Sequence, residues 1–328
     1  MNHRPNVTLS CMLKTLWPAL ALLASSILLA QEQDPVTEPL PQAGETVSET
    51  AQAEDVQAED AQAGTAQSET PATEPEVPVQ SLTGPLDLLV NPVYPPETAR
   101  RVYQPLVDYL NEATGLEINL VVDRNFHRYW LNARRNEAPP LILEDAHIVA
   151  WRMINFDYQP LVAASKPITF SLLTTATGDL ADAALMDFVG RRISSLPSPS
   201  LGYLVLADWY DNPMQQPLIE STATSWMDAV EMVFSGEVDA AIAPDNIAAR
   251  YPNLSSVDTS PEFPGLTLSA APDVPDDVRQ RLIDAMTALH SDEEHHAALF
   301  ELDIDEFVDA VPADYEGMEQ WLSTVFAL

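Results

Sequence analysis

The chain has 328 residues, of which 50 are acidic and only 15 basic, and its formal net charge is −35. Such a surface repels nucleic acid phosphates and anionic lipid head groups, so we expect no nucleic acid partner. The only cysteine, Cys11, lies near the start, so neither an internal disulfide nor a cysteine-ligated metal site is expected in the folded part.

The first thirty residues have the layout of an export signal. Arg4 and Lys14 precede or flank an apolar run at residues 16–30, and a polar stretch follows it. The run is shorter than the roughly 20 residues that a membrane-spanning helix needs, which favours a cleaved signal over an anchor. Residues 1–30 are therefore predicted to be a signal peptide or an N-terminal anchor. The protein is expected in the periplasm, where it would stay anchored to the membrane if the signal is not cleaved.

Residues 31–80 differ from the rest in composition. They contain twelve acidic residues, no basic residue and no aromatic residue, with near-repeats such as AQAEDVQAEDAQAG. Such a segment cannot bury enough apolar surface to offset chain entropy, so it predicts an acidic disordered spacer. The remaining 38 acidic and 13 basic residues outside the first eighty leave the folded part acidic in its own right.

After the spacer, short apolar runs alternate with amphipathic segments. Pro105 is expected to divide the first helix into two pieces, and Gly115 to end it. The alternation predicts β-α-β units with parallel strands, arranged as two small α/β units joined by crossing strands and separated by a cleft. The expected strands are residues 86–90, 116–122, 141–143, 168–174, 192–196 and 238–243, and the expected helices are 96–113, 126–135, 180–189, one after Ser200, 225–234, one from Pro275 and 316–326.

Three stretches of this region carry a family pattern. They are YQPLVDYL at residues 103–110 with Thr114 and Gly115 after it, the turn PSPSLGY at 197–203, and the passage around SGEVDAA at 235–241. In order and spacing they resemble the periplasmic substrate-binding proteins of the phosphonate, phosphite and phosphate type. The resemblance implies the two-lobed type II α/β fold, with mixed sheets, flanking helices and a ligand cleft between the lobes. Residues 81–165 and 265–328 would form lobe 1 and residues 166–264 lobe 2.

The same resemblance implies a solute-binding protein, not an enzyme. It would capture a phosphonate- or phosphate-like oxyanion for the permease of an ABC-type transporter, as a monomer without cofactor or metal. Two alternatives stay open: a membrane-tethered sensor or accessory protein with the same fold, and a hydrolase that uses Glu144, Asp145 and His147. The histidines of HSDEEHH (residues 290–296) match no zinc spacing.

The expected ligand-binding residues lie at strand ends and helix starts. Ser198 and Ser200 precede a helix that begins near Tyr203, where N–H groups and hydroxyls would cradle oxyanion oxygens, unless the serines only cap the helix. Tyr94 would pack on the ligand or on its neighbouring prolines. Phe126 stands where the family usually has a tyrosine. Asp245 follows the strand expected at 238–243. Glu144, Asp145 and His147, at the end of the third strand, complete the set.

The third strand departs most from the family pattern. Where the family commonly has an aspartate that starts the strand and Gly-Pro that ends it, residues 139–147 read PPLILEDAH. If Glu144 and Asp145 both faced the ligand, a dianion would be repelled and a cationic, zwitterionic or partly protonated ligand preferred. Adjacent strand residues point to opposite faces, so the alternative is that at most one of them faces the cleft. For His147 the alternative is a structural role.

Overall fold

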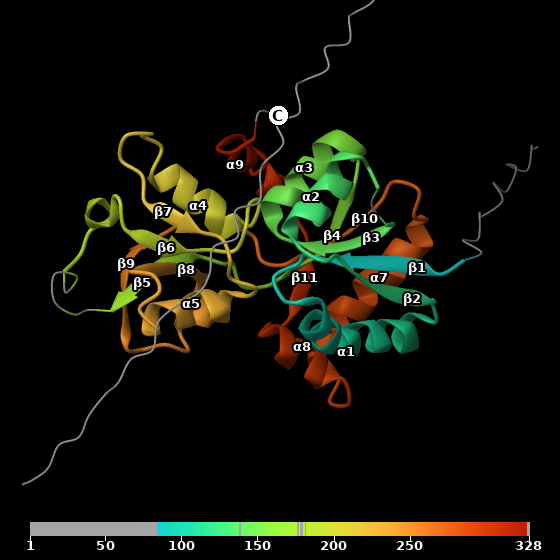
Figure 1. Ribbon diagram of the computed structural model, residues 1–328. Coiled ribbons are helices and arrows are strands. Elements are labelled where there is room, and N and C mark those ends of the chain that lie inside the picture. Colours follow the sequence, from blue (N-terminus) through green and yellow to red (C-terminus); the bar gives the residue numbers. More distant parts are fainter. Residues whose placement is uncertain (1–83, 138, 176, 178–179, 181, 327–328) are drawn as a thin grey trace, which may run out of the picture. The chain divides into compact units, whose positions relative to one another are not determined.

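The computed structural model describes residues 84–137, 139–175, 177, 180 and 182–326 (Figure 1). The export signal and the spacer expected at residues 1–80 lie outside this part. The described strands are β1 (Leu86–Val90), β2 (Ile118–Val122), β3 (Leu141–Glu144), β4 (Gln159–Ala164), β5 (Phe170–Thr175), β6 (Arg192–Ser194), β7 (Leu218–Glu220), β8 (Ala240–Pro244), β9 (Leu254–Thr259), β10 (Thr267–Ala270) and β11 (Phe307–Asp309).

The helices alternate with these strands along most of the chain. The described α-helices are α1 (Pro96–Thr114), α2 (Phe126–Arg134), α3 (Ala146–Phe156), α4 (Leu201–Trp209), α5 (Trp226–Phe234), α6 (Asp245–Ala248), α7 (Asp276–Ala288), α8 (His296–Leu302) and α9 (Gln320–Ser323), and the 3₁₀ turns are η2 (Leu185–Phe188), η3 (Leu289–Ser291) and η4 (Pro312–Tyr315). Within the described residues, no helix has both the length and the apolar character needed to cross a bilayer.

The first lobe is built on a sheet with the strand order β11-β4-β10-β3-β1-β2. β1 pairs in parallel with β2 and β3, whereas β10 is antiparallel to both β3 and β4. Helices α2 and α3 cover one face of this sheet, and α1, α7 and α8 lie on the other (Figure 1). The parallel β1-β2 and β1-β3 pairs bring the carboxyl ends of these strands to one edge, where ligands bind in open α/β sheets.

The second lobe is built on a sheet with the order β7-β6-β8-β5-β9. β6 pairs in parallel with β7 and β8, and β5 is antiparallel to β8 and β9. Helices α4 and α5 lie on opposite faces (Figure 1). The two sheets with helices on both faces confirm the predicted two-lobed fold with mixed sheets. The bounds predicted for the lobes stay a prediction, although they divide the chain between these same two sets of strands.

Local sequence signals explain where the helices begin and end. α1 buries apolar side chains at helical spacing, and Gly115 ends it in the left-handed region at a φ of 65°, with its N–H bonded to the Asn111 carbonyl. α5 begins after Ser225, whose hydroxyl accepts the Asp228 N–H. The prediction that Pro105 divides α1 was wrong, because buried residues on both sides of it keep the helix in one piece.

Two other predicted helices were wrong in extent. Among the described residues of 180–189 the structure has 3₁₀ geometry, at Leu180 and in η2, and no α-helix. The Asp187 carboxylate accepts the Ala184 N–H, and the backbone at Ala184 is extended. At 316–326 the chain makes turns around the short helix α9. The strands β4, β7, β9, β10 and β11 were not predicted. β7, β10 and β11 have only three or four residues, and β7 and β9 are half-buried or exposed.

Two segments cross between the lobes side by side. One joins β4 to β5 and the other joins β9 to β10, and they pair through reciprocal backbone hydrogen bonds of 2.9 Å between Ile168 and Phe263. Gly265 lies so close to the first segment that a Cβ there would come within 2.7 Å of the Lys166 carbonyl. The C-terminal helix α9 adds a third contact, because it packs on α3 of the first lobe and on α4 of the second.

Candidate functional site

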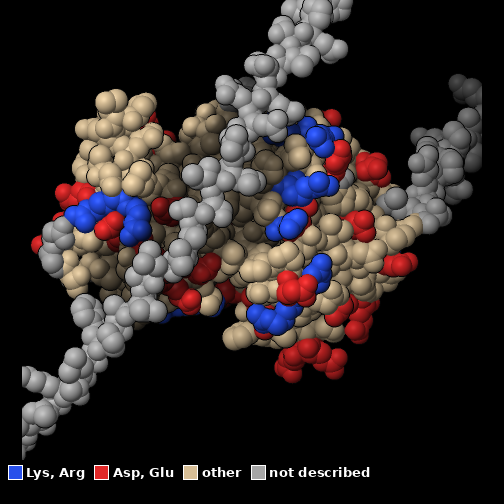
Figure 2. Space-filling view, viewed as in Figure 1, with Lys and Arg blue, Asp and Glu red and all other residues tan. Residues whose placement is uncertain are grey.

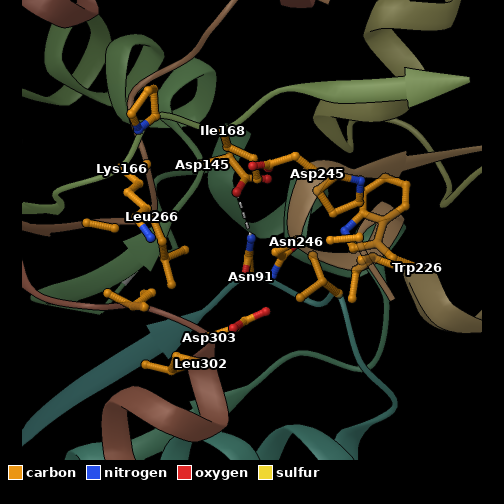
Figure 3. Close-up of a pocket in the computed structure, with 18 of the residues that line it drawn as sticks. Asn91, Asp145, Lys166, Ile168, Trp226, Asp245, Asn246, Leu266, Leu302 and Asp303 are labelled. Atoms are coloured by element: carbon orange, nitrogen blue, oxygen red, sulfur yellow. Dashed lines mark hydrogen bonds between the residues drawn. The ribbon is translucent and has the colours of Figure 1, made fainter. Parts of the chain in front are cut away.

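A cavity of about 390 Å³ lies where the two lobes meet the crossing segments, which is within the size range of small-molecule sites (Figure 3). Both lobes and both crossing segments contribute to its wall. The residues that line it are Asn91, Val93, Tyr94, Tyr103, Asp145, Ala164, Lys166, Pro167, Ile168, Trp226, Met227, Pro244, Asp245, Asn246, Ile247, Ala249, Gly265, Leu266, Leu302, Asp303, Ile304 and Asp305.

The first-lobe wall is a chain of hydrogen bonds at the ends of β1 and β3. Asn91 follows β1 and Asp145 follows β3, and because these parallel strands are neighbours their ends meet. The Tyr103 hydroxyl of α1 donates to Asn91 Oδ1 over 3.2 Å, and Asn91 Nδ2 donates to Asp145 Oδ1, also over 3.2 Å. Burial raises the pKa of Asp145 to about 6 against the opposing effect of the Asn91 bond, so this carboxyl is mainly ionised at neutral pH.

The second-lobe wall comes from the start of α5 and the residues after β8. Trp226 is the first residue of α5, and its ring packs edge-on against Phe170 at a centroid distance of 5.5 Å. Asp245 and Asn246 follow β8, so they reach the cavity from the carboxyl end of a strand of the second sheet. The Asn246 Oδ1 atom is buried and has no hydrogen-bond partner in the described part of the chain.

The crossing segments and the α8-β11 loop add charge to the remaining wall. Lys166 forms a 2.5 Å ion pair with Asp305, and Asp303 pairs with Arg250 at 3.0 Å. The hydrogen bond with Asp305 is the main cause that raises the pKa of Lys166, and Asp303 and Asp245 add to it through space. The lysine thus stays protonated and lies within the field of several carboxylates.

A buried charged cluster lies behind the first-lobe wall. Arg152 Nε donates to both Glu144 carboxylate oxygens, at 2.9 and 3.1 Å, and the Tyr129 hydroxyl donates to the same carboxylate. Both side chains of the Glu144–Arg152 pair are fully buried, and the guanidinium lies over the rings of Tyr129 and Tyr158. Glu144 is therefore neutralised inside the lobe and does not line the cavity.

The predicted ligand-binding residues fall into two groups in the structure. Tyr94, Asp145 and Asp245 line the cavity together. Phe126 is buried in the first lobe, where its ring meets that of Tyr129 edge-on. His147 is also buried, and its Nε2 lies 2.8 Å from the carbonyl oxygen of Pro199 in the other lobe. Burial lowers the pKa of His147 to about 4, so the ring is neutral and Nε2 donates this bond.

The serine turn before α4 does not line the cavity either. The Ser200 hydroxyl donates to the Leu196 carbonyl over 3.0 Å, and the buried Ser198 hydroxyl has no partner among the described residues. Tyr203 lines a separate cavity beside Tyr210 and the C-terminal residues Thr324 and Val325. Gly202 in the first turn of α4 packs on Trp226, since a Cβ there would come within 2.7 Å of the indole ring.

Several cavity residues were missed from the sequence. Asn91 follows a predicted strand directly, which was a usable signal, because residues at the carboxyl ends of strands line such sites. Trp226 carries the helical spacing of a core residue and is indeed buried, so its second role at the cavity had no signal of its own. Lys166 and Asn246 lie in connections whose course depends on how the lobes meet.

Groups that would hold a metal are not found in the described residues: no three His, Cys, Asp or Glu side chains converge there. The three residues considered for hydrolysis are held apart from one another by different partners. Glu144 is paired with Arg152, Asp145 accepts from Asn91, and His147 donates to Pro199. They form no nucleophile-base-acid arrangement.

Solved structures of two-lobed binding proteins resemble this fold at low sequence identity. PhnD1 from Prochlorococcus marinus, solved with methylphosphonate, is 13% identical with a TM-score of 0.59, and the match covers 72% of this chain and 96% of that one. A binding-protein component of an ABC phosphonate transporter from Pseudomonas aeruginosa is 13% identical with a TM-score of 0.60, covering 72% and 85%. A Xanthomonas citri protein solved with ATP is 12% identical with a TM-score of 0.58, covering 74% and 96%.

The sequence itself matches a family model. No curated protein matches the chain. The model described as "ABC transporter, phosphonate, periplasmic substrate-binding protein" matches residues 88–315, which is most of the chain and nearly all of its described part. Most of both lobes, the two crossing segments and the cavity lie in the matched region, and α9 follows it. The chain therefore belongs to the family of periplasmic substrate-binding proteins of phosphonate-type ABC transporters, which are binding proteins and not enzymes.

Proposed function

We propose that this protein collects a small polar solute in the cavity between its lobes and presents the closed, loaded form to a membrane permease. As a family member it works outside the cytoplasm, with a small-molecule ligand and a permease as partners. We further propose that it acts as a monomer, and that the N-terminal segment either is removed on export or tethers the protein to the membrane.

One observation carries this proposal: side chains at the strand ends of both sheets meet at one cavity. Asn91 and Asp145 come from the first lobe, and Trp226 and Asp245 from the second. A solute that touches both sets stabilises the arrangement in which the lobes are close, and a ligand can shift the closure of the lobes only through such a difference in contacts. The walls are positioned for that kind of recognition.

Trp226 provides a direct readout of binding. We would titrate the full chain with methylphosphonate, phosphate, phosphite, 2-aminoethylphosphonate, choline and 1,4-diaminobutane, and follow tryptophan emission and the melting temperature. At least one solute is expected to raise the melting temperature, because a ligand that binds only the folded state stabilises it, and to change the emission.

Two matched variants test whether the signal arises in the cavity. Trp226→Phe should remove the emission change, whereas Trp209→Phe, in α4 and outside the cavity, should keep it. The proposal fails if no solute of the panel alters the melting temperature, or if the emission change persists in Trp226→Phe.

A further inference from the structure

The cavity wall carries an excess of negative charge. Four aspartates and one lysine line it, and the lysine is already paired with Asp305. Asp303 is paired with Arg250, whereas Asp145 and Asp245 form no ion pair with any described residue. These two carboxylates come from opposite lobes, and Figure 3 shows both at the cavity. A phosphonate dianion placed between them would meet like charge on both sides, and Lys166, the cation of the described wall, is already paired with Asp305.

The cavity wall offers a ligand several acceptors, beside the donor groups of Lys166, Tyr94 and the Asn246 amide nitrogen. The Asn91 amide is used on both sides, since Oδ1 accepts from Tyr103 and Nδ2 donates to Asp145. The buried Asn246 Oδ1 lacks a donor among the described residues. A buried acceptor without a donor is costly, and a ligand that donates hydrogen bonds removes that cost. Two carboxylates and one amide oxygen together match an ammonium group better than an oxyanion.

The position expected to bind an oxyanion is covered by an aromatic ring. Trp226 lines the cavity and packs on Gly202 in the first turn of α4, and no residue of the turn at 197–203 lines the cavity. Ser200 uses its hydroxyl on the Leu196 carbonyl. The indole of Trp226 therefore lies at the cavity in the place where the start of α4 would supply N–H groups to phosphonate oxygens. Indole rings attract ammonium groups through their negative faces.

From these three observations we infer that the solute of this cavity is a small organic cation, held by Asp145 and Asp245 from opposite lobes and by the indole of Trp226. The inference rests on the proposed function, because it names the ligand class of the same cavity. Figure 2 shows acidic side chains at the boundary between the lobes on the visible face, with basic ones on the neighbouring surface of the first lobe.

The test is calorimetric titration of the full chain with probes that differ in charge. Choline and 1,4-diaminobutane are the cations, methylphosphonate is the anion, and 2-aminoethylphosphonate carries both groups. We expect at least one cation to bind with a Kd at least tenfold below that of methylphosphonate. We also expect 2-aminoethylphosphonate to bind more tightly than methylphosphonate, because its ammonium adds the favourable contact.

Asp245→Asn should weaken cation binding tenfold or more and leave the melting temperature of the unliganded protein within a few degrees, because this side chain is exposed and unpaired among described residues. Asp273→Asn removes the same charge from an exposed site of the first lobe outside the cavity and should change cation affinity less than twofold. Equal effects of the two variants would overturn the inference, since they would reflect net charge alone.

The outcomes separate this inference from the proposed function. If methylphosphonate binds more tightly than either cation, the charge inference is overturned while the role as a solute receptor stands. If no probe of either charge binds, both are overturned. Tight cation binding that Asp245→Asn weakens and Asp273→Asn leaves unchanged supports both.

Discussion

Two adjacent carboxylates at the end of β3 have different roles because successive residues of a strand point to opposite sides. Glu144 points into the first lobe, where Arg152 and Tyr129 satisfy it, and Asp145 reaches the cavity, where it has only the Asn91 amide. Removing one partner of the buried Glu144–Arg152 pair would leave the other as an uncompensated charge. Asp145 is only half-buried and keeps contact with solvent. One step along the chain therefore separates a structural acid from one positioned for a ligand.

Asp145 should make the stability depend on pH. Its pKa is about 6 in the folded protein against an ordinary value near 3.8, so the folded state holds this proton more tightly. The resulting stabilisation is full below pH 3.8 and is lost as pH rises through 6. We therefore compare the free energy of unfolding of Asp145→Asn with that of the wild type. The difference between them should shift in favour of the variant as the pH rises from 4.5 to 7. Urea unfolding at both pH values measures this difference.

His147 provides the control, because its effect has the opposite sign. Its pKa of about 4 lies below the ordinary value of 6.5, so the stability that it contributes is present above pH 6.5 and is lost as pH falls towards 4. His147→Gln should therefore lose more stability relative to wild type at pH 7 than at pH 4.5. Parallel pH curves for Asp145→Asn and the wild type would contradict the assignment of Asp145.

At the scale of elements, α1 shows how tertiary packing overrides a local signal. Pro105 lacks an N–H and its ring crowds the preceding turn, which on its own ends or kinks a helix. The helix nevertheless runs from Pro96 to Thr114, because Tyr103, Leu106 and Leu110 bury apolar surface on both sides of the proline. Helical stability in proteins comes mostly from such packing.

Replacing this proline should therefore stabilise the protein. Pro105→Ala restores a backbone donor inside α1 and removes a ring that is only half-buried. Proline is about 3 kcal/mol less favourable than alanine inside a helix, and the added freedom of the unfolded chain offsets about 0.4–1 kcal/mol of that. We expect the free energy of unfolding to rise by about 2 kcal/mol in urea titrations. A loss of stability would show that the helix is adapted to a kink at this residue.

The helices and strands with clear caps or a clear apolar pattern were predictable, because these signals are local. Ser225 and Gly115 act within one turn of the helices that they bound. The candidate site was less predictable, because it depends on contacts between distant segments. Nothing near Ser198 or Ser200 indicates that Trp226 packs on the neighbouring Gly202, and nothing near Asn91 indicates the contact with Asp145, which lies 54 residues later. The order of the strands in the sheets determines both contacts.

For the whole molecule, the crossing segments determine how the lobes can move. They are paired at Ile168 and Phe263, and α9 contacts both lobes, with the Trp321 ring 5.1 Å from that of Phe263. Among the described residues, the link between the lobes includes two segments paired at one β-bridge and the C-terminal helix α9. A change that separates the crossing segments should affect stability and ligand binding together, since the same segments line the cavity.

Gly265 allows a test of this link, because the backbone of the other crossing segment lies directly beside it. A Cβ at Gly265 would lie 2.7 Å from the Lys166 carbonyl oxygen and 2.9 Å from that of Ala164, and both are backbone atoms that cannot move without their segment. Gly265→Ala is expected to lower the free energy of unfolding by about 1–3 kcal/mol, the usual range for overpacking, and to weaken solute binding at least threefold. Gly84→Ala is the matched control, since a Cβ there meets no atom within 4 Å. Unchanged unfolding and binding in Gly265→Ala would mean that the segments separate freely, and that the lobes are not held at this crossing.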